Sequence, residues 1–243
     1  MGVSPRAVTF DFWGTLFVEG PGYADTVLPL RYEALLQALS EAGLPEEGQN
    51  VQEAYRQAGL HFEALWKAGR SAPPYERVRY LFWLLGLPQK EEQLSAVTRR
   101  IEEASLSAEL TLLPGAREAL PELARHAALA IVSDTGWTSG AYLKEHLRRH
   151  GLLQYFQAFS FSDATGVVKP HPQAFLKALD PLGLSPREAL HIGDLPQTDL
   201  VGACQVGYGW VVHYIGHRAL EGLEGVPQIR DHRELLRWFE EAA

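Results

Sequence analysis

The 243-residue chain has a single cysteine, Cys204, and no long hydrophobic run. One cysteine cannot form an internal disulfide or the multi-cysteine site that binds structural zinc. A membrane-spanning helix needs about 20 consecutive apolar residues, and no stretch approaches that length. Residues Met1 to Asp11 also lack the apolar core of a secretory signal. We therefore expect a cytoplasmic protein with no membrane partner.

Basic residues are in the minority. Lys and Arg number 22 against 30 Asp and Glu, so the formal net charge is −8. Proteins that bind nucleic acids use Lys and Arg to neutralise phosphates, so we expect no nucleic-acid partner. The composition, with 46% hydrophobic and 21% charged residues, is ordinary for a globular protein. The length suits one α/β domain with a smaller insertion. It does not tell whether the protein forms oligomers.

The first third of the chain has the pattern of amphipathic helices. From about Tyr23 to Leu106, apolar residues recur at three- and four-residue spacing, and Gly or Pro separates the segments. This pattern predicts a block of about four helices, the size of a small bundle. The predicted helices span residues 23–43, 50–69, 74–86 and 91–107.

The rest of the chain alternates between strand and helix patterns. Such alternation predicts right-handed βαβ units and a mostly parallel sheet, with the helical block inserted after the first strand. The predicted strands span residues 7–12, 127–134, 156–163, 189–194 and 209–215. Helices are predicted over 138–150, after Pro172, and over 197–206 and 231–241.

Polar residues stand where four of these strands end: Asp11, Ser133 with Asp134, Asp163, and Asp194. Open α/β sheets bind ligands beyond the carboxyl ends of their strands. The segment DFWGTL (11–16) has a carboxylate that can attack phosphorus or carbon, followed by Thr15. The alternative is that each of these acids only caps the turn or helix that follows it.

Three further segments carry polar groups suited to an anion and a cation. IVSDTG (131–136) offers the Ser133 hydroxyl and the turn at Asp134 and Thr135 for an anion, or only a helix cap. GVVKPHP (166–172) has Lys169, a point charge for a phosphate or an ordinary surface lysine. HIGDLPQTD (191–199) has two acids that suit a hard cation, or a solvated pair that caps a helix. Those acids are Asp194 and Asp199.

In this order, the four segments resemble the four motifs of the haloacid dehalogenase superfamily, and the helical block is similar to its C1-type cap. The resemblance covers nearly the whole chain. It implies a Rossmann-like core of residues 1–17 and 109–243 and a helical cap of residues 18–108. It further implies a Mg²⁺-dependent hydrolase of small phosphorylated or halogenated substrates that acts through an aspartyl ester.

The resemblance assigns a role to each motif residue. Asp11 would be the nucleophile, and it would bind Mg²⁺ together with Asp194 and the backbone carbonyl of Trp13. Asp199 would support the metal. The remaining motif residues would bind the substrate: Thr15, Ser133 and Lys169 at the phosphoryl oxygens, with Asp134, Thr135 and the Trp13 side chain beside them.

Trp13 departs from the pattern of the family's phosphatases, which have an acid at that position to protonate the leaving group. An indole N–H cannot do this. The L-2-haloacid dehalogenases have tyrosine there, but they work without metal, and their fourth motif differs from Asp194 to Asp199. Three readings stay open: a phosphatase, which we favour, a dehalogenase, and a catalytically weak binding protein.

The helical block contains further candidates. Arg31 and Arg70 are candidates for binding an anionic part of the substrate, or are solvated arginines. We expect most aromatic residues of the block to pack its interior. The histidines do not have the spacing of metal ligands, and we expect them to be structural. These aromatic residues are Trp66, Tyr75, Tyr80, Phe82 and Trp83, and the histidines are His61, His171, His191 and His213.

Overall fold

The computed structural model describes residues 4–44 and 48–240. Its main feature is a six-stranded sheet in which every pair of neighbouring strands is parallel. The mostly parallel α/β fold predicted from the sequence is therefore confirmed. The strands, in their order across the sheet, are β5 (Phe156–Phe161), β4 (Ala128–Ser133), β1 (Ala7–Phe10), β6 (Ala189–Gly193), β7 (Trp210–Tyr214) and β8 (Gln228–Ile229).

Helices cover both faces of this sheet, and alternate strand residues belong to two different hydrophobic clusters. Leu129 and Ile131 of β4 pack in a cluster with α5 and α6. Ala130 and Val132 pack in another cluster with α8 and α9. Strands buried on both faces read as unbroken apolar runs. The helices are α5 (Ala116–His126), α6 (Gly140–Arg149), α8 (Pro172–Leu179) and α9 (Val201–Val206).

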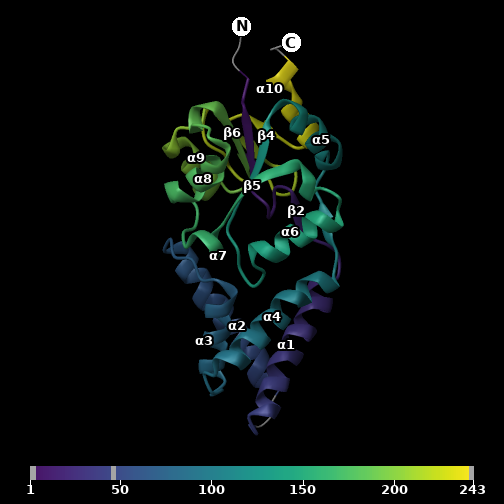
Figure 1. Cartoon of the computed structure of the whole chain (residues 1–243), viewed down its shortest axis with the longest axis vertical. Coiled ribbons are helices and arrows are strands. Elements are labelled where there is room, and N and C mark those ends of the chain that lie inside the picture. Colours follow the sequence, from purple (N-terminus) through teal and green to yellow (C-terminus); the bar gives the residue numbers. More distant parts are fainter. Residues whose placement is uncertain (1–3, 45–47, 241–243) are drawn as a thin grey trace.

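A four-helix unit, α1–α4, lies beyond one end of the sheet, and the described ends of the chain lie at the opposite end of the molecule (Figure 1). The unit has its own hydrophobic cluster, separate from the two clusters at the sheet. Its helices are α1 (Tyr23–Glu41), α2 (Gly48–Lys67), α3 (Pro74–Leu84) and α4 (Glu91–Glu103), and a 3₁₀ turn, η1 (Ala104–Ser107), follows them. None of the helices described is both long and apolar enough to cross a membrane.

A two-stranded antiparallel ribbon joins the two connections between the sheet and the four-helix unit. It pairs β2 (Phe17–Glu19) with β3 (Leu110–Leu112). The sequence did not predict this ribbon, because three-residue strands are too short to show a periodic pattern. The helix α5 was also not predicted. The division into a core of residues 1–17 and 109–243 and a cap of residues 18–108 stays a prediction.

The predicted terminal helix over residues 231–241 forms only in part. A 3₁₀ segment, η6 (His232–Leu236), precedes a short helix, α10 (Arg237–Glu240), and residue 241 lies outside the described residues. Asp231 caps η6, and its side chain accepts a hydrogen bond from the Arg233 N–H at 2.9 Å. The buried Leu235 packs in the cluster of α5 and α6.

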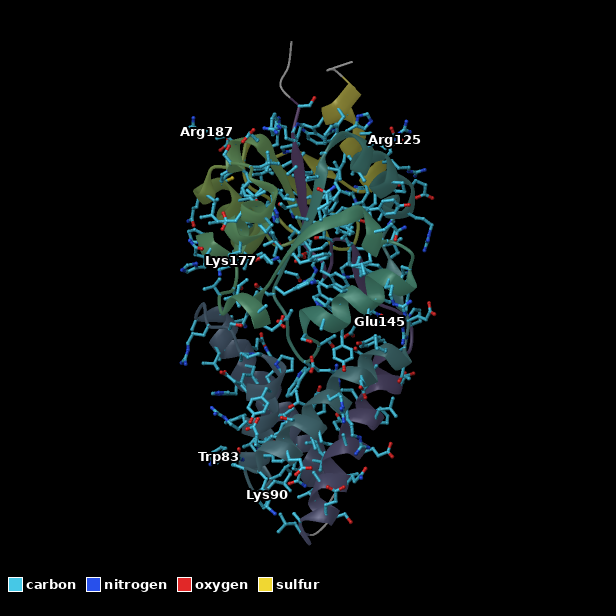
Figure 2. All side chains as sticks on the ribbon, in the orientation of Figure 1. Trp83, Lys90, Arg125, Glu145, Lys177 and Arg187 are labelled. Carbon is cyan, nitrogen blue, oxygen red and sulfur yellow. The ribbon has the colours of Figure 1, made fainter. Side chains whose placement is uncertain are left out.

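Two adjacent residues of α3 provide a test of the separate packing of the four-helix unit. Phe82 is fully buried in its cluster, whereas Trp83 is 67% exposed and projects outward (Figure 2). We expect Phe82→Ala to lower the free energy of unfolding by about 3–5 kcal/mol, because it leaves a cavity. Trp83→Ala should change it by about 0.5 kcal/mol or less. Equal effects of the two substitutions in urea denaturation would contradict this packing.

Candidate active site at the carboxyl edge of the sheet

Polar residues lie at the carboxyl ends of the central strands β1, β4 and β6, along one edge of the sheet. Phe10 of β1 pairs with Ile131 of β4 and Ile192 of β6, so Asp11 lies between the ends of its neighbours. The Asp11 backbone N–H donates to the carbonyl oxygen of Ile192 at 2.9 Å. Ser133 and Asp194 follow at the ends of the two flanking strands. The structure thus brings residues of three sequence motifs together.

Lys169 connects the first and fourth motifs. Its Nζ lies 2.6 Å from Oδ1 of Asp11 and 2.6 Å from Oδ1 of Asp199, and all three side chains are buried. Burial alone would lower the pKa of Lys169, but the carboxylates of Asp11, Asp199 and Asp134 outweigh it and hold this pKa above its usual value. Lys169 is therefore a charged residue in a buried ion pair, and the alternative of a surface lysine is wrong.

Asp199 is held from several sides. Its Oδ2 accepts a hydrogen bond from the Leu195 N–H at 3.0 Å, and Nε2 of His191 lies 3.5 Å from its Oδ1. A Cβ at Gly193 would overlap this carboxyl group, so only glycine fits there. Burial opposes ionisation of Asp199, but Lys169 and His191 lower its pKa to about 2. Asp199 is thus a charged residue whose two oxygens both have partners.

Asp194 contrasts with Asp199. Its side chain is fully buried, and neither carboxylate oxygen accepts a hydrogen bond from the described residues. Burial, followed by the charge of Asp199, raises the pKa of Asp194 to about 6. A half-exposed Arg218 places its Nε 3.4 Å from Oδ2, which is a weak, solvent-screened ion pair. A buried carboxylate without hydrogen bonds is unfavourable unless another charge compensates it.

The turn between Asp11 and Thr15 leaves room for the Asp194 carboxylate. Gly14 has a positive φ of 77°, and a Cβ at this position would overlap Oδ2 of Asp194. Asp11, Asp194 and Asp199 each offer one oxygen atom, and the three atoms lie within 4.8 Å of one another. Oxygen ligands of this kind suit Mg²⁺ or Ca²⁺. The three buried carboxylates could therefore hold a metal ion.

The pKa of Asp11 reflects the same crowding. Burial raises it well above its usual value, the charges of Asp199 and Asp194 raise it further, and Lys169 lowers it. Thr15 donates from its hydroxyl to Oδ2 of Asp11 at 3.3 Å. The two oxygens of Asp11 thus face Lys169 and Thr15, which fix the orientation of the carboxylate.

The hydroxyl groups of the second motif have local partners. Ser133, which is buried, donates to the backbone carbonyl of Asp134 at 3.3 Å. The Thr135 hydroxyl lies 3.1 Å from Oγ of Ser162 and accepts from the Asp163 N–H at 3.1 Å. Neither hydroxyl makes a hydrogen bond to Asp11 or Lys169.

Asp163, also expected at this edge, caps α6. Its Oδ1 accepts from the Gly140 N–H at 3.1 Å. Among the acids that end the predicted strands, the structure therefore brings Asp11 and Asp194 together and leaves Asp163 with a structural contact.

A cleft of about 360 Å³ opens between the edge of the sheet and the four-helix unit. This volume is sufficient for a small metabolite. On the sheet side it reaches Asp11 and Lys169. The half-buried Trp13 also lines it, packed edge-to-face against Phe12 with ring centroids 5.0 Å apart. The cleft is also lined by Phe62, Trp66 and Arg77 from α2 and α3, and by Asp134, Gly136 and Trp137 from the loop after β4.

Asp134 connects the two sides of this cleft. Its Oδ2 accepts from Nε1 of Trp66 in α2 at 2.8 Å, and its Oδ1 accepts from the Lys169 backbone N–H at 3.0 Å. Burial raises the pKa of Asp134, while Lys169 and Trp66 lower it. Trp66 thus lines the cleft and is not one of the aromatic residues that pack the interior of the helical block.

The arginine candidates of the sequence do not line the cleft. Arg31 is buried and donates to the carbonyl of Ile101 at 3.1 Å, to the hydroxyl of Tyr55 at 2.9 Å and to that of Thr138 at 3.2 Å. It is therefore not a solvated arginine. Arg70 is exposed, and its backbone forms an isolated bridge with Val167.

The cleft contains residues that sequence reasoning missed. These are Phe62, Arg77 and Trp137. None belongs to the four motifs, and nothing in the neighbouring sequence distinguishes them from ordinary packing or surface residues. The histidines His191 and His213 are buried, and each has a contact that fits the predicted structural role. His191 lies against Asp199, and Nε2 of His213 lies 3.2 Å from the backbone carbonyl oxygen of Asp194.

The sequence of the chain is similar to those of known proteins. The chain is 30% identical to the (S)-2-haloacid dehalogenase of Xanthobacter autotrophicus over 210 residues, which cover 84% of this chain and 72% of that protein. It is 35% identical to a glyceraldehyde 3-phosphate phosphatase of Pyrococcus furiosus over 114 residues, 46% of each chain. Over the first curated relatives it matches, the chain spans about half of their length or less.

Solved structures give the same fold. The 2-haloacid dehalogenase of Pseudomonas syringae pv. Tomato DC3000 superimposes with a TM-score of 0.71 at 21% identity, over 98% of this chain and all of that one. A family model described as haloacid dehalogenase-like hydrolase matches residues 5–207, which is most of the chain. The chain therefore belongs to the haloacid dehalogenase-like hydrolases.

Proposed function

We propose that this protein is a Mg²⁺-dependent phosphatase that hydrolyses a small phosphorylated metabolite through an aspartyl phosphate on Asp11. The observation that carries the proposal is the buried Asp194 carboxylate, which faces Asp11 and accepts no hydrogen bond from the described residues. A divalent cation would compensate its charge. Asp194, Asp11 and the backbone carbonyl of Trp13 would hold Mg²⁺, and Asp199 would support the metal.

The residues around Asp11 suit an in-line displacement at phosphorus. An oxygen of Asp11 would attack, the bond from phosphorus to the leaving group would break, and water would then release inorganic phosphate from the aspartyl phosphate. Lys169 and Thr15 would orient Asp11 and bind phosphoryl oxygens. Bound Mg²⁺ would supply positive charge that offsets the negative charge of the phosphoryl group. The helical cap of residues 18–108 would close this site against water.

A dehalogenase is the second candidate, favoured by Trp13 and by the dehalogenase that matches most of this chain. In that reaction Asp11 would displace a halide from carbon. The reaction does not require a cation at Asp194. The buried carboxylate without hydrogen bonds therefore supports the phosphatase more than the dehalogenase.

The first test concerns the nucleophile. We expect Asp11→Asn to reduce phosphatase kcat by about 10³-fold or more, because an amide does not form the ester. Its circular dichroism spectrum should match that of the wild type. Asp25→Asn, on the exposed first turn of α1, is the matched control and should keep full activity. Substantial turnover by the Asp11 variant would refute the covalent role.

The second test uses pH to probe metal binding. The pKa of Asp194 is raised to about 6 in the folded protein, so its protonated form favours folding and this contribution is lost as pH rises through about 6. Mg²⁺ needs the charged form. Millimolar Mg²⁺ should therefore raise the Tm clearly at about pH 7.5, and much less at about pH 5, where a proton competes.

The control for this measurement is Asp194→Asn. The amide keeps the shape of the side chain but not its charge, so Mg²⁺ should no longer raise the Tm of this variant at either pH. A Tm shift of equal size in the variant, or at both pH values in the wild type, would exclude Asp194 as a metal ligand.

The third test concerns the missing proton donor. Aryl and acyl phosphates release stable anions, whereas alkyl phosphates need a proton for the leaving group, and a positioned acid contributes a factor of about 10²–10⁴. We expect kcat to fall steeply from p-nitrophenyl phosphate to sugar phosphates. Trp13→Asp should recover part of the activity on sugar phosphates. Trp13→Asn should not, because asparagine has the shape of aspartate but cannot donate the proton.

Each competing function has its own outcome in these assays. Rapid hydrolysis of simple alkyl phosphates by the wild type would contradict our interpretation of Trp13. Chloride release from an L-2-haloacid in excess EDTA, with no phosphate ester hydrolysed, would identify a dehalogenase. Mg²⁺-dependent binding of anions with neither reaction would identify a binding protein.

A further inference from the structure

Arg77 lines the same cleft as Asp11 and Lys169, but it comes from the four-helix unit. Lys169 is bound by two carboxylates at the sheet edge. No carboxylate of the described residues lies within 4.0 Å of the Arg77 guanidinium, whereas exposed arginines such as Arg56 and Arg148 pair with nearby glutamates. The cleft thus has a second cationic group, well separated in the sequence from the first.

The guanidinium of Arg77 is held in place without being neutralised. Its Nε donates to the carbonyl oxygen of Ala72 at 2.8 Å. Its central carbon lies 4.8 Å from the ring centre of Phe62 and 5.5 Å from that of Trp137. One carbonyl and two aromatic rings fix the group, but none supplies a full negative charge. A fixed fork of N–H donors is well suited to a carboxylate.

The environment makes an unpaired charge at Arg77 unfavourable. Burial lowers its pKa to about 10, which is the effect of desolvation on a cation. The two terminal nitrogens make no hydrogen bond to any side chain or backbone group that the structure describes, so they are free to bind a ligand. Arg77 is half-buried, and an anion in the cleft would supply the charge that the described residues do not provide.

The loop after β4 lies beside this group. Gly136 also lines the cleft, and a Cβ built on it would lie 4.0 Å from Nη1 of Arg77. This is an ordinary van der Waals distance, so the loop passes directly beside the terminal nitrogen. Trp13, Trp66 and Trp137 supply aromatic surface along the cleft, which suits a carbon skeleton between two anionic ends.

We propose that Arg77 forms a second anion-binding subsite that selects phosphate esters with a carboxylate on the leaving group. This proposal rests on the proposed phosphatase function. Lys169 and the carboxylate cluster would define the phosphoryl end of the substrate, and Arg77 would bind the carboxylate at the other end. The subsite would thereby align the bond that breaks with Asp11.

Two substrates that differ in one charge test the proposal. We expect the wild type to hydrolyse 4-carboxyphenyl phosphate with a kcat/KM about 10- to 100-fold higher than that for 4-carbamoylphenyl phosphate. The second compound has an uncharged amide in place of the carboxylate. Arg77→Met should abolish this preference, so that the two esters are hydrolysed with about equal kcat/KM. Arg77→Lys should retain part of it. Arg79→Met, on the exposed side of the same helix, should keep the full preference.

A binding measurement separates this proposal from the proposed function. The corresponding benzylphosphonates cannot be hydrolysed, so calorimetry with Mg²⁺ compares their affinities without any turnover. The carboxylated compound should bind about 10- to 100-fold more tightly to the wild type and with no such advantage to Arg77→Met. Equal affinities for the two compounds, or an advantage that persists in Arg77→Met, would overturn the subsite even if phosphate esters are hydrolysed. A normal subsite without hydrolysis would refute only the phosphatase.

Discussion

The buried contact of Lys169 with two carboxylates is the constraint on which the rest of the site depends. Its ammonium lies 2.6 Å from an oxygen of Asp11 and 2.6 Å from one of Asp199, and Asp194 adds a third buried carboxylate. One lysine cannot neutralise three acids, and water screens charge poorly in a buried site. Burial, together with the charges of the neighbouring acids, raises the pKa values of Asp11 and Asp194. A bound cation would remove it.

The parallel sheet makes such a cluster possible because it ends three central strands at one edge. Two glycines then permit the close approach of the acids: a Cβ at Gly14 would overlap Asp194, and one at Gly193 would overlap Asp199. Folding energy from the hydrophobic clusters on both faces of the sheet therefore supports an arrangement that the carboxylates alone would oppose. The fold and the site are linked through backbone positions that have no side chain.

The sequence predicts the parallel sheet and the meeting of Asp11 and Asp194 at its edge. It does so because the central strands are apolar on both faces and end in polar residues. It fails where structure depends on distant packing. The β2–β3 ribbon has no periodicity of its own, and the cleft wall depends on how α2 and α3 lie against the loop after β4. Arg31 and Arg77 look alike in sequence, yet Arg31 is used in three internal hydrogen bonds and Arg77 faces the cleft.

In the proposed phosphatase, the aromatic lining of the cleft would connect the lack of an acid at Trp13 with the electrostatics of the site. Trp13, Trp66 and Trp137 line the same cleft as Lys169 and Arg77 and add aromatic surface to it. A less polar cleft would strengthen the attraction of both cations for an anionic substrate, but it would also leave less solvent to protonate a leaving group. The Trp13 side chain would therefore favour binding of an anionic substrate and restrict the leaving groups that the enzyme can release. A substrate that leaves as a stabilised anion would benefit from the first effect and be insensitive to the second, so in the proposed phosphatase the aromatic wall would itself select for that kind of leaving group.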